Sequence, residues 1–259
     1  MKNQIKILGA YGTKAKGYGT SAFYLNEKNM IDAGNLLSTL EEQCGYIENI
    51  WLTHSHLDHI CDIAYILDNY YSQREKSLVI HGLPETITAL QEDFLNNRIW
   101  PDFSKIMLSD QKTPCIEYKV IEFGTVYTLE DGTTIEAYPT DHTVASCGYI
   151  YTKNKRAILI TADTYSLETT FEIIERNKSI KAMVIECSFP SSMDKLALES
   201  KHLTPKILFE SLDGLKREDI RLYINHIKPL YLEEIIKEIK QLGALWSPII
   251  LKDKEIIFF

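Results

Sequence analysis

The sequence predicts an α+β protein in which sheets and helices stack in layers within a single domain, residues 1–259. Three observations predict this class. Short apolar stretches with two-residue alternation dominate the first half of the chain, as expected for half-buried strands. Strands and helical patterns alternate in the second half, which is typical of sheets covered by helices. No repeat or linker rich in proline, glycine or serine divides the chain.

The expected strands are short and apolar, and most are bounded by polar or glycine-containing turns. In chain order they are Gln4–Leu8, Ser21–Leu25, Met30–Asp32, Ile47–Leu52, Leu78–His81, Cys115–Glu122, Thr133–Tyr138, Cys147–Tyr151, Ala157–Thr161, Ala182–Glu186 and Arg221–Ile224. The glycine-rich segment Gly9–Gly19 does not satisfy the phosphate-loop pattern and precedes a strand rather than a helix, so we expect a plain connecting loop there.

Two helices are clearest in the second half. Thr204 and Pro205 form a good N-cap and first-position pair, and leucines at helical spacing follow them. Apolar residues also recur at helical spacing over Leu232–Leu242, and Gly243 follows as a stop signal.

Composition and charge limit which partners and which cellular compartment are expected for this protein. The chain has 28 basic and 36 acidic residues, a net charge of −8, whereas a domain that holds a long nucleic acid is usually basic. No stretch approaches the roughly 18 apolar residues of a membrane span, so no membrane partner is expected. Lysines interrupt the N-terminal stretch where a signal peptide needs an apolar core, and the five cysteines form no CxxC pair. We therefore expect a reduced, cytoplasmic protein.

The histidines mark a metal site. Three of the seven lie within one segment of six residues, at His54, His56 and His59, directly after an expected strand. In an extended stretch His54 and His56 point to the same side and can share one ion. A turn after His56 then lets Asp58 and His59 face a second ion. Imidazole and carboxylate together suit zinc, manganese or iron better than calcium or magnesium.

Further candidate ligands follow three later strands. They are His142, Asp163 and His226, and each comes directly after an apolar stretch. Ligands placed at strand ends can converge on one edge of a sheet. Together with the histidine segment they complete a site for two metal ions.

In this order the pattern HxHxDH, followed by His142, Asp163 and His226, resembles the metallo-β-lactamase superfamily. The resemblance implies an αββα four-layer sandwich. It implies that one metal is held by His54, His56 and His142. It implies that the other is held by Asp58, His59 and His226. Asp163 would then bridge both ions.

Three short motifs narrow the resemblance. Glu186–Phe189 (ECSF), His202–Pro205 (HLTP) and His226–Pro229 (HIKP) are similar to motifs of the class II 3′,5′-cyclic-nucleotide phosphodiesterases. That family would hydrolyse cyclic AMP, cyclic GMP or both to 5′-nucleotides. The alternative is ribonuclease Z, which processes tRNA 3′ ends and shares the HLT element. Its bacterial form carries a long RNA-binding arm, for which the interval between His142 and Asp163 leaves no room. A non-catalytic nucleotide sensor would lack a ligand or the acid, and none is missing here.

The resemblance sets expectations for the chemistry. Two divalent ions would hold a bridging hydroxide that attacks the phosphorus, and His202 is the candidate general acid for the leaving 3′ oxygen. Asp58 is either a metal ligand alone or also a residue that orients the water. Glu186 either orients a metal-bound histidine or simply ends a strand. The expected partner is a small nucleotide rather than a long nucleic acid, and a homodimer remains open.

Two lysines near these motifs have two interpretations. Lys201 precedes the HLTP motif, and Lys228 lies within the HIKP motif. Both are candidates for offsetting phosphate charge, or they are solvated surface residues.

Overall fold

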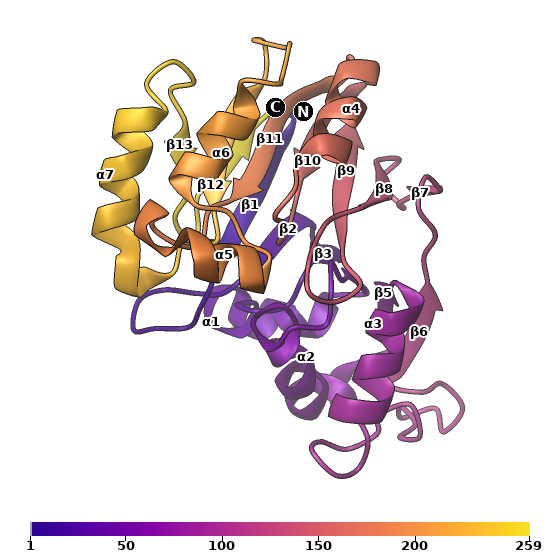
Figure 1. Cartoon of the computed structure of the whole chain (residues 1–259). Coiled ribbons are helices and arrows are strands. Elements are labelled where there is room, and N and C mark those ends of the chain that lie inside the picture. The colour runs from indigo at the N-terminus through magenta and orange to yellow at the C-terminus, as the bar shows by residue number, and fades with distance from the viewer. Residues whose placement is uncertain (1) are drawn as a thin grey trace.

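Two seven-stranded mixed sheets pack face to face, with helices on their outer sides, in the computed structural model, which describes residues 2–259 (Figure 1). The expected αββα sandwich is confirmed. Each sheet has an antiparallel part and a parallel part. The chain builds the first sheet largely from its first half and the second sheet from the rest, and the last strand, β14, returns to pair with β1.

The first sheet has the strand order β14-β1-β2-β3-β4-β5-β6. Its strands are β1 (Gln4–Gly9), β2 (Ala22–Asn26), β3 (Asn29–Ile31), β4 (Asn49–Trp51), β5 (Leu78–Gly82), β6 (Ile116–Val120) and β14 (Ile256–Phe258). The second sheet has the order β13-β12-β11-β10-β9-β8-β7. Its strands are β7 (Val126–Thr128), β8 (Thr134–Pro139), β9 (Cys147–Lys153), β10 (Arg156–Ile160), β11 (Ile180–Glu186), β12 (Arg221–Asn225) and β13 (Ile249–Ile250).

The helices cover the two outer faces. They are α1 (Leu37–Leu40), α2 (Leu57–Tyr70), α3 (Pro84–Ala89), α4 (Glu168–Arg176), α5 (Asp194–Ser200), α6 (Pro205–Leu212) and α7 (Leu232–Leu242). Short 3-10 turns occur at Glu41–Tyr46, Tyr71–Gln73, Ser191–Met193 and Pro229–Tyr231, and a π-helical turn occurs at Leu90–Phe94. Among residues 2–259, none of these helices is long and apolar enough to cross a bilayer.

Three hydrophobic cores hold the layers together. Phe23 of the first sheet and Tyr149 of the second are completely buried members of the core between the sheets. Ile63 of α2 and Ile80 of β5 belong to a second core under the helices of the first sheet. Leu208 of α6 belongs to the third core, on the outer face of the second sheet. The alternation seen in the sequence therefore reflects strands whose two faces pack against different layers.

The largest departure from the sequence expectation lies at α2. A turn was expected after His56, but a fourteen-residue helix begins at Leu57. Its buried face includes Ile60, Ile63 and Leu67, which recur at helical spacing and pack under the first sheet. This helix carries Asp58 and His59 in its first turn.

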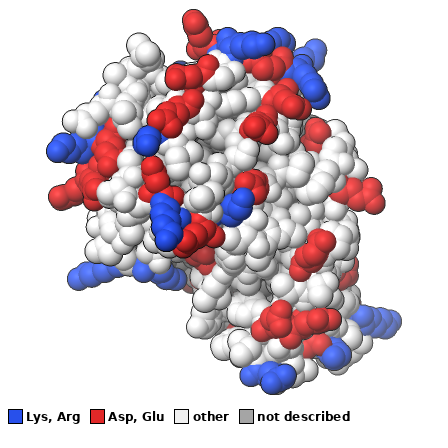
Figure 2. All heavy atoms as spheres, viewed as in Figure 1, with Lys and Arg blue, Asp and Glu red and all other residues white. Residues whose placement is uncertain are grey.

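Charged side chains are spread in small groups over the surface. On the face shown in Figure 2, acidic and basic residues lie beside one another around a broad uncharged region. All five cysteines are free thiols, in keeping with the expectation that they form no disulfide framework.

Candidate active site

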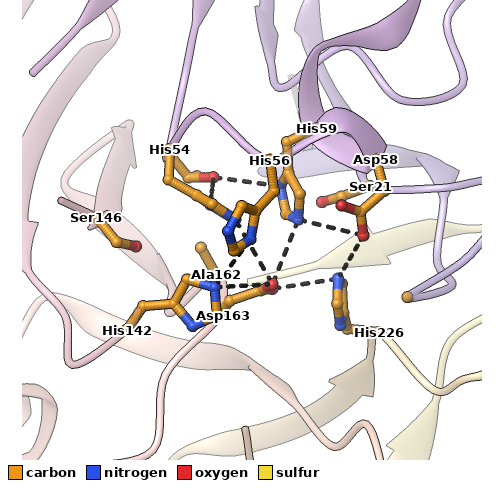
Figure 3. Close-up of polar contacts among 12 residues, drawn as sticks. Ser21, His54, His56, Asp58, His59, His142, Ser146, Ala162, Asp163 and His226 are labelled. Atoms are coloured by element: carbon orange, nitrogen blue, oxygen red, sulfur yellow. Dashed lines mark hydrogen bonds and ion pairs between the residues drawn. The ribbon is translucent and has the colours of Figure 1, made fainter. Parts of the chain in front are cut away.

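All seven side chains expected to bind metal converge at one end of the sandwich (Figure 3). The connection from β4 to α2 supplies His54 and His56, and the first turn of α2 supplies Asp58 and His59. The loops that follow β8, β10 and β12 supply the other three, which are His142, Asp163 and His226. Both sheets therefore contribute to the site.

Asp163 occupies the centre of the cluster. Its Oδ2 lies 3.7 Å from His54 Nε2 and 3.5 Å from His59 Nε2. The same oxygen is 3.8 Å from His142 Nε2. Its other oxygen, Oδ1, is 3.2 Å from His226 Nε2. One carboxylate thus faces imidazoles of both expected ligand groups.

The ligand atoms form two compact sets that share this centre. Potential ligand atoms lie within 4.8 Å of one another in the set His54, His56, His142 and Asp163. The same holds for the set Asp58, His59 and His226. These two sets have the membership that the family resemblance implied, and a third set with the same spacing consists of Asp163, His202 and His226.

Several of these atoms are buried without a hydrogen-bond partner within residues 2–259. They are His54 Nε2, His59 Nε2, His226 Nε2 and Asp163 Oδ1. Buried polar atoms are normally paired, so four such atoms facing one another require an explanation. A divalent cation satisfies imidazole nitrogens and carboxylate oxygens together. The donor set therefore fits metal ions.

Hydrogen bonds on the opposite ring nitrogens orient these imidazoles. Thr53 Oγ1 lies 3.0 Å from His54 Nδ1. Asp32 Oδ2 lies 2.7 Å from His59 Nδ1, and Ser188 Oγ lies 2.9 Å from His226 Nδ1. A partner on Nδ1 leaves the Nε2 lone pair available for a metal, as is usual for metal-binding histidines.

Burial and charge favour the ligand forms of two central residues. Burial, together with the neighbouring His59, lowers the pKa of His54 well below its usual value, so this imidazole is neutral. Burial alone would raise the pKa of Asp163, but the imidazoles of His226 and His59 hold the pKa of that carboxyl well below its usual value. A neutral imidazole and an ionised carboxylate are the forms that bind metal.

His202 lies beside the cluster and is held by Glu186. The ring of His202 is centred 5.5 Å from that of His226, and its Nδ1 is 2.7 Å from Glu186 Oε1. Ser188 Oγ donates to Glu186 Oε2 at 2.7 Å. Burial lowers the pKa of His202, but the Glu186 carboxylate outweighs burial, and the pKa is raised above its usual value.

The family of class-II cAMP phosphodiesterases matches residues 12–244. The chain belongs to this family. It is 27% identical over 206 residues to 3′,5′-cyclic-nucleotide phosphodiesterase 1 of Saccharomyces cerevisiae, an alignment that covers 71% of this chain and 55% of that protein. The chain thus spans little more than half the length of the curated relatives it matches.

Solved structures agree on the fold. Unliganded yeast PDE1 has a TM-score of 0.83 at 20% identity, and the match covers 100% of both chains. The short form of human tRNase Z has a TM-score of 0.67 at 17% identity, covering 98% of each chain. The metallo-β-lactamase fold protein YhfI of Bacillus subtilis has a TM-score of 0.74 at 19% identity, covering 98% of each chain, so the fold is the one to which the sequence resemblance pointed. Because both functional alternatives share this fold, fold alone does not separate them.

In this class-II family member, sequence reasoning missed the role of Asp32. The residue ends an expected strand and was given no function. It is fully buried, contacts His59, and accepts a hydrogen bond from the Thr53 backbone N–H at 2.9 Å. Its backbone φ of 58° is in the left-handed region, which is uncommon outside glycine. The available signal was an aspartate at the end of a strand, as at Asp163.

The glycine-rich segment is a connecting loop between β1 and β2, as expected, but it also packs against the site. A Cβ atom at Gly12 would lie 2.5 Å from the carbonyl oxygen of His226 and 2.7 Å from its Nδ1. Only glycine leaves room for this imidazole. The loop therefore packs against one of the candidate metal ligands.

The two lysines near the motifs lie at the rim of the site. Lys201 Nζ is 3.1 Å from Asp141 Oδ2, and the backbone carbonyl of Lys201 accepts from His142 Nδ1 at 3.1 Å. Lys228 Nζ donates to the Gly12 carbonyl at 3.1 Å. Both ammonium groups therefore already have partners in the protein.

Glu186 makes no direct contact with a candidate metal-binding histidine of the expected set. It contacts His202 directly and reaches His226 only through Ser188.

Proposed function

We propose that this chain is a metal-dependent phosphodiesterase that hydrolyses 3′,5′-cyclic nucleotides, cyclic AMP or cyclic GMP, to 5′-nucleotides. One observation supports it most strongly. Buried imidazole and carboxylate atoms without partners face one another beside His202, which is paired with a carboxylate, in a chain that belongs to the class-II family.

In this proposal His54, His56 and His142 would hold one divalent ion. Asp58, His59 and His226 would hold a second, and Asp163 would serve both sites. Zinc is the favoured identity, and manganese and iron suit the same ligands. When bound, two such ions supply an activated water and offset the negative charge of the phosphodiester.

His202 supplies the proton for the leaving 3′ oxygen. Glu186 occupies Nδ1, which leaves Nε2 as the ring nitrogen that can donate. The Glu186 carboxylate raises the pKa of His202 and so favours the protonated ring that a general acid requires. Ring opening then needs no other proton donor.

Asp58 serves both as a ligand and as an acceptor that orients the attacking water. Its Oδ2 is 3.4 Å from His226 Nε2 and 3.8 Å from His59 Nε2. Its side chain is 27% exposed, whereas Asp163 is nearly inaccessible at 2%. Asp58 is thus the cluster carboxylate that a solvent molecule can reach.

A small nucleotide fits this surface better than a long RNA. Strands β9 and β10 and their turn fill most of the interval from His142 to Asp163, so a long arm has no place there. On the face in Figure 2, basic residues lie among acidic ones rather than in a continuous strip. A polynucleotide backbone would favour such a strip. A ribonuclease Z-like activity is therefore the second candidate.

A substrate panel on the metal-loaded protein tests the proposal. It comprises cyclic AMP, cyclic GMP, a linear phosphodiester and a tRNA precursor. We expect 5′-nucleotides from at least one cyclic nucleotide, with much slower turnover of the other substrate classes. Cleavage of the tRNA precursor alone would overturn the proposal in favour of the second candidate.

The role of His202 has a separate test. Replacing His202 with Ala should lower kcat by about 10²–10⁴-fold, the usual contribution of a general acid, while the metal content per chain is unchanged. Metal content is measured by elemental analysis and kcat on a cyclic nucleotide. Loss of metal in this variant would instead make His202 a ligand, and full activity would remove it from the mechanism.

A further inference from the structure

Strand β6 is an open edge of the first sheet. Among residues 2–259 it pairs only with β5, in parallel, and it lies at the side of the molecule (Figure 1). The segment before β6 folds back on itself: Met107 pairs with Pro114, and the Cys115 N–H donates to the Ile106 carbonyl. The free edge therefore begins at Ile116.

The hydrogen bonds at the ends of the β5–β6 ladder show which backbone groups are free. Leu78 N donates to Cys115 O, and Ile121 N donates to Gly82 O. Backbone groups alternate in direction along a strand, so the odd-numbered residues of β6 face β5. The N–H and C=O groups of Ile116, Tyr118 and Val120 consequently point away from the sheet. Exposed edges of this kind are templates for pairing with another strand.

The charges of β6 are complementary to those of a second copy of β6 that is paired with it antiparallel. The sequence is Ile-Glu-Tyr-Lys-Val, with Glu117 and Lys119 placed symmetrically about Tyr118. In an antiparallel pair centred on Tyr118, each Glu117 faces Lys119 of the other strand. This register also aligns the free groups of Ile116 with those of Val120. Ile116 and Val120 would then form hydrogen-bonded pairs, and Glu117 and Lys119 would form non-hydrogen-bonded pairs, in which Cα atoms are only about 4.5 Å apart and side chains approach closely.

Exposed apolar residues continue this edge. Val120 is 54% exposed, Phe123 in the following turn is 48% exposed, and Val126 of β7 is 57% exposed. Strand β7 is the edge of the second sheet, so both sheets end here in accessible apolar side chains. Burial of such side chains would add to the backbone pairing.

We propose that β6 is a homodimer interface, in which two copies of the chain pair antiparallel about a two-fold axis at Tyr118. A two-fold contact uses the same patch on both partners, and β6 meets this condition in sequence as well as in backbone direction. Charged residues on an edge strand usually prevent pairing. Here they attract in one register and therefore select it. The inference does not depend on the proposed chemistry.

Charge reversal tests the register. Glu117→Lys and Lys119→Glu each place like charges opposite one another, so each variant alone should sediment as a monomer where the wild type sediments as a dimer. An equimolar mixture of the two variants should form heterodimers, because every facing pair is then of opposite charge. The double variant should also dimerise. Glu122→Lys, which makes the same charge change outside the strand, should leave the dimer intact.

Sedimentation velocity over a wide range of protein concentrations distinguishes monomer from dimer. Circular dichroism and phosphodiester hydrolysis, measured on the same samples, show whether each variant is folded. Ser77 Oγ contacts both Glu117 and the Pro114 carbonyl, so it keeps a partner in the Glu117→Lys variant. A monomeric wild type would overturn the proposal. So would a dimer that persists in both single variants, or a mixture that stays monomeric.

Discussion

Two buried carboxylates orient histidines at this site by contacting their Nδ1 atoms. Asp32 is hydrogen bonded to Nδ1 of His59, and Glu186 is hydrogen bonded to Nδ1 of His202. The two imidazoles have different expected roles, one as a ligand and one as an acid. The difference follows from which ring nitrogen of each histidine faces Asp163. His59 Nε2 is buried 3.5 Å from Asp163 Oδ2, whereas the ring nitrogen that His202 brings within 4.0 Å of Asp163 is Nδ1, which is already paired with Glu186.

Replacing Glu186 with Gln should shift the pH dependence of the reaction. In the wild type the Glu186 carboxylate raises the pKa of His202 against the opposing effect of burial, so removing its charge lowers that pKa. The acid must be protonated, and activity falls as pH rises through its pKa. The alkaline limb of the kcat–pH profile should therefore move to lower pH in the variant. Glutamine keeps an oxygen that can accept from the Thr164 N–H, as Glu186 does.

The control for this experiment is Glu172→Gln, a neutralisation on the exposed face of α4. Its profile should match that of the wild type. An alkaline limb that stays in place in the Glu186→Gln variant would contradict the assignment of Glu186 as the group that holds the proton on His202.

At the scale of single elements, the turn before α6 contains both His202 and Thr204, the residue that caps the helix. Thr204 caps this helix by accepting from the Ile207 N–H at 3.3 Å, and it donates to Asp194 Oδ1 at 2.8 Å. Thr204→Ala should lower the free energy of unfolding by about 1 kcal/mol, the usual value of an N-cap. Thr204→Ser keeps the hydroxyl and should retain most of the stability. Urea unfolding at a fixed metal concentration measures the stability of both variants. Equal unfolding midpoints for Thr204→Ala and Thr204→Ser would contradict the capping role of the hydroxyl.

The sequence predicted those helices and strands whose boundaries are marked by nearby residues. The helix after Thr204 and the strands that end before Asp163 and His226 were predicted because their apolar spacing and flanking residues are distinct. Helix α2 was missed although its apolar spacing is helical. His56 is an unusual N-cap and makes no side-chain capping bond, so the usual start signal is absent.

Contacts between distant elements could not be predicted in the same way. Asp32 reaches His59 only because β3 pairs with β4 in the first sheet. Glu186 reaches His202 because the end of β11 packs beside the turn before α6. Neither pairing follows from spacing along the chain. The convergence of the candidate metal ligands could be predicted because a dense histidine segment and strand-end residues combine into one recognisable pattern.

At the scale of the whole molecule, the candidate metal site lies where the two sheets meet. The segment after β4 belongs to the first sheet, while His142, Asp163 and His226 follow strands of the second. Among residues 2–259, four candidate ligand atoms are buried without a hydrogen-bond partner, and each such atom costs roughly 1–3 kcal/mol when left unsatisfied. Bound ions would remove that cost and link the layers. Metal binding and folding stability are therefore expected to be coupled.

Removal of metal by a chelator should consequently lower the melting temperature. An ion present at a thousandfold its Kd contributes about 4 kcal/mol to stability. Since 1 kcal/mol corresponds to roughly 2–4 °C in a chain of this size class, we expect a decrease on the order of 10 °C. Differential scanning calorimetry of the metal-loaded and chelator-treated protein measures it, and added zinc or manganese should restore the original value. Asp163→Asn removes the shared carboxylate charge, so its melting temperature should respond far less to the chelator. Equal melting temperatures for loaded and treated wild-type protein would show that the buried cluster is stable without ions.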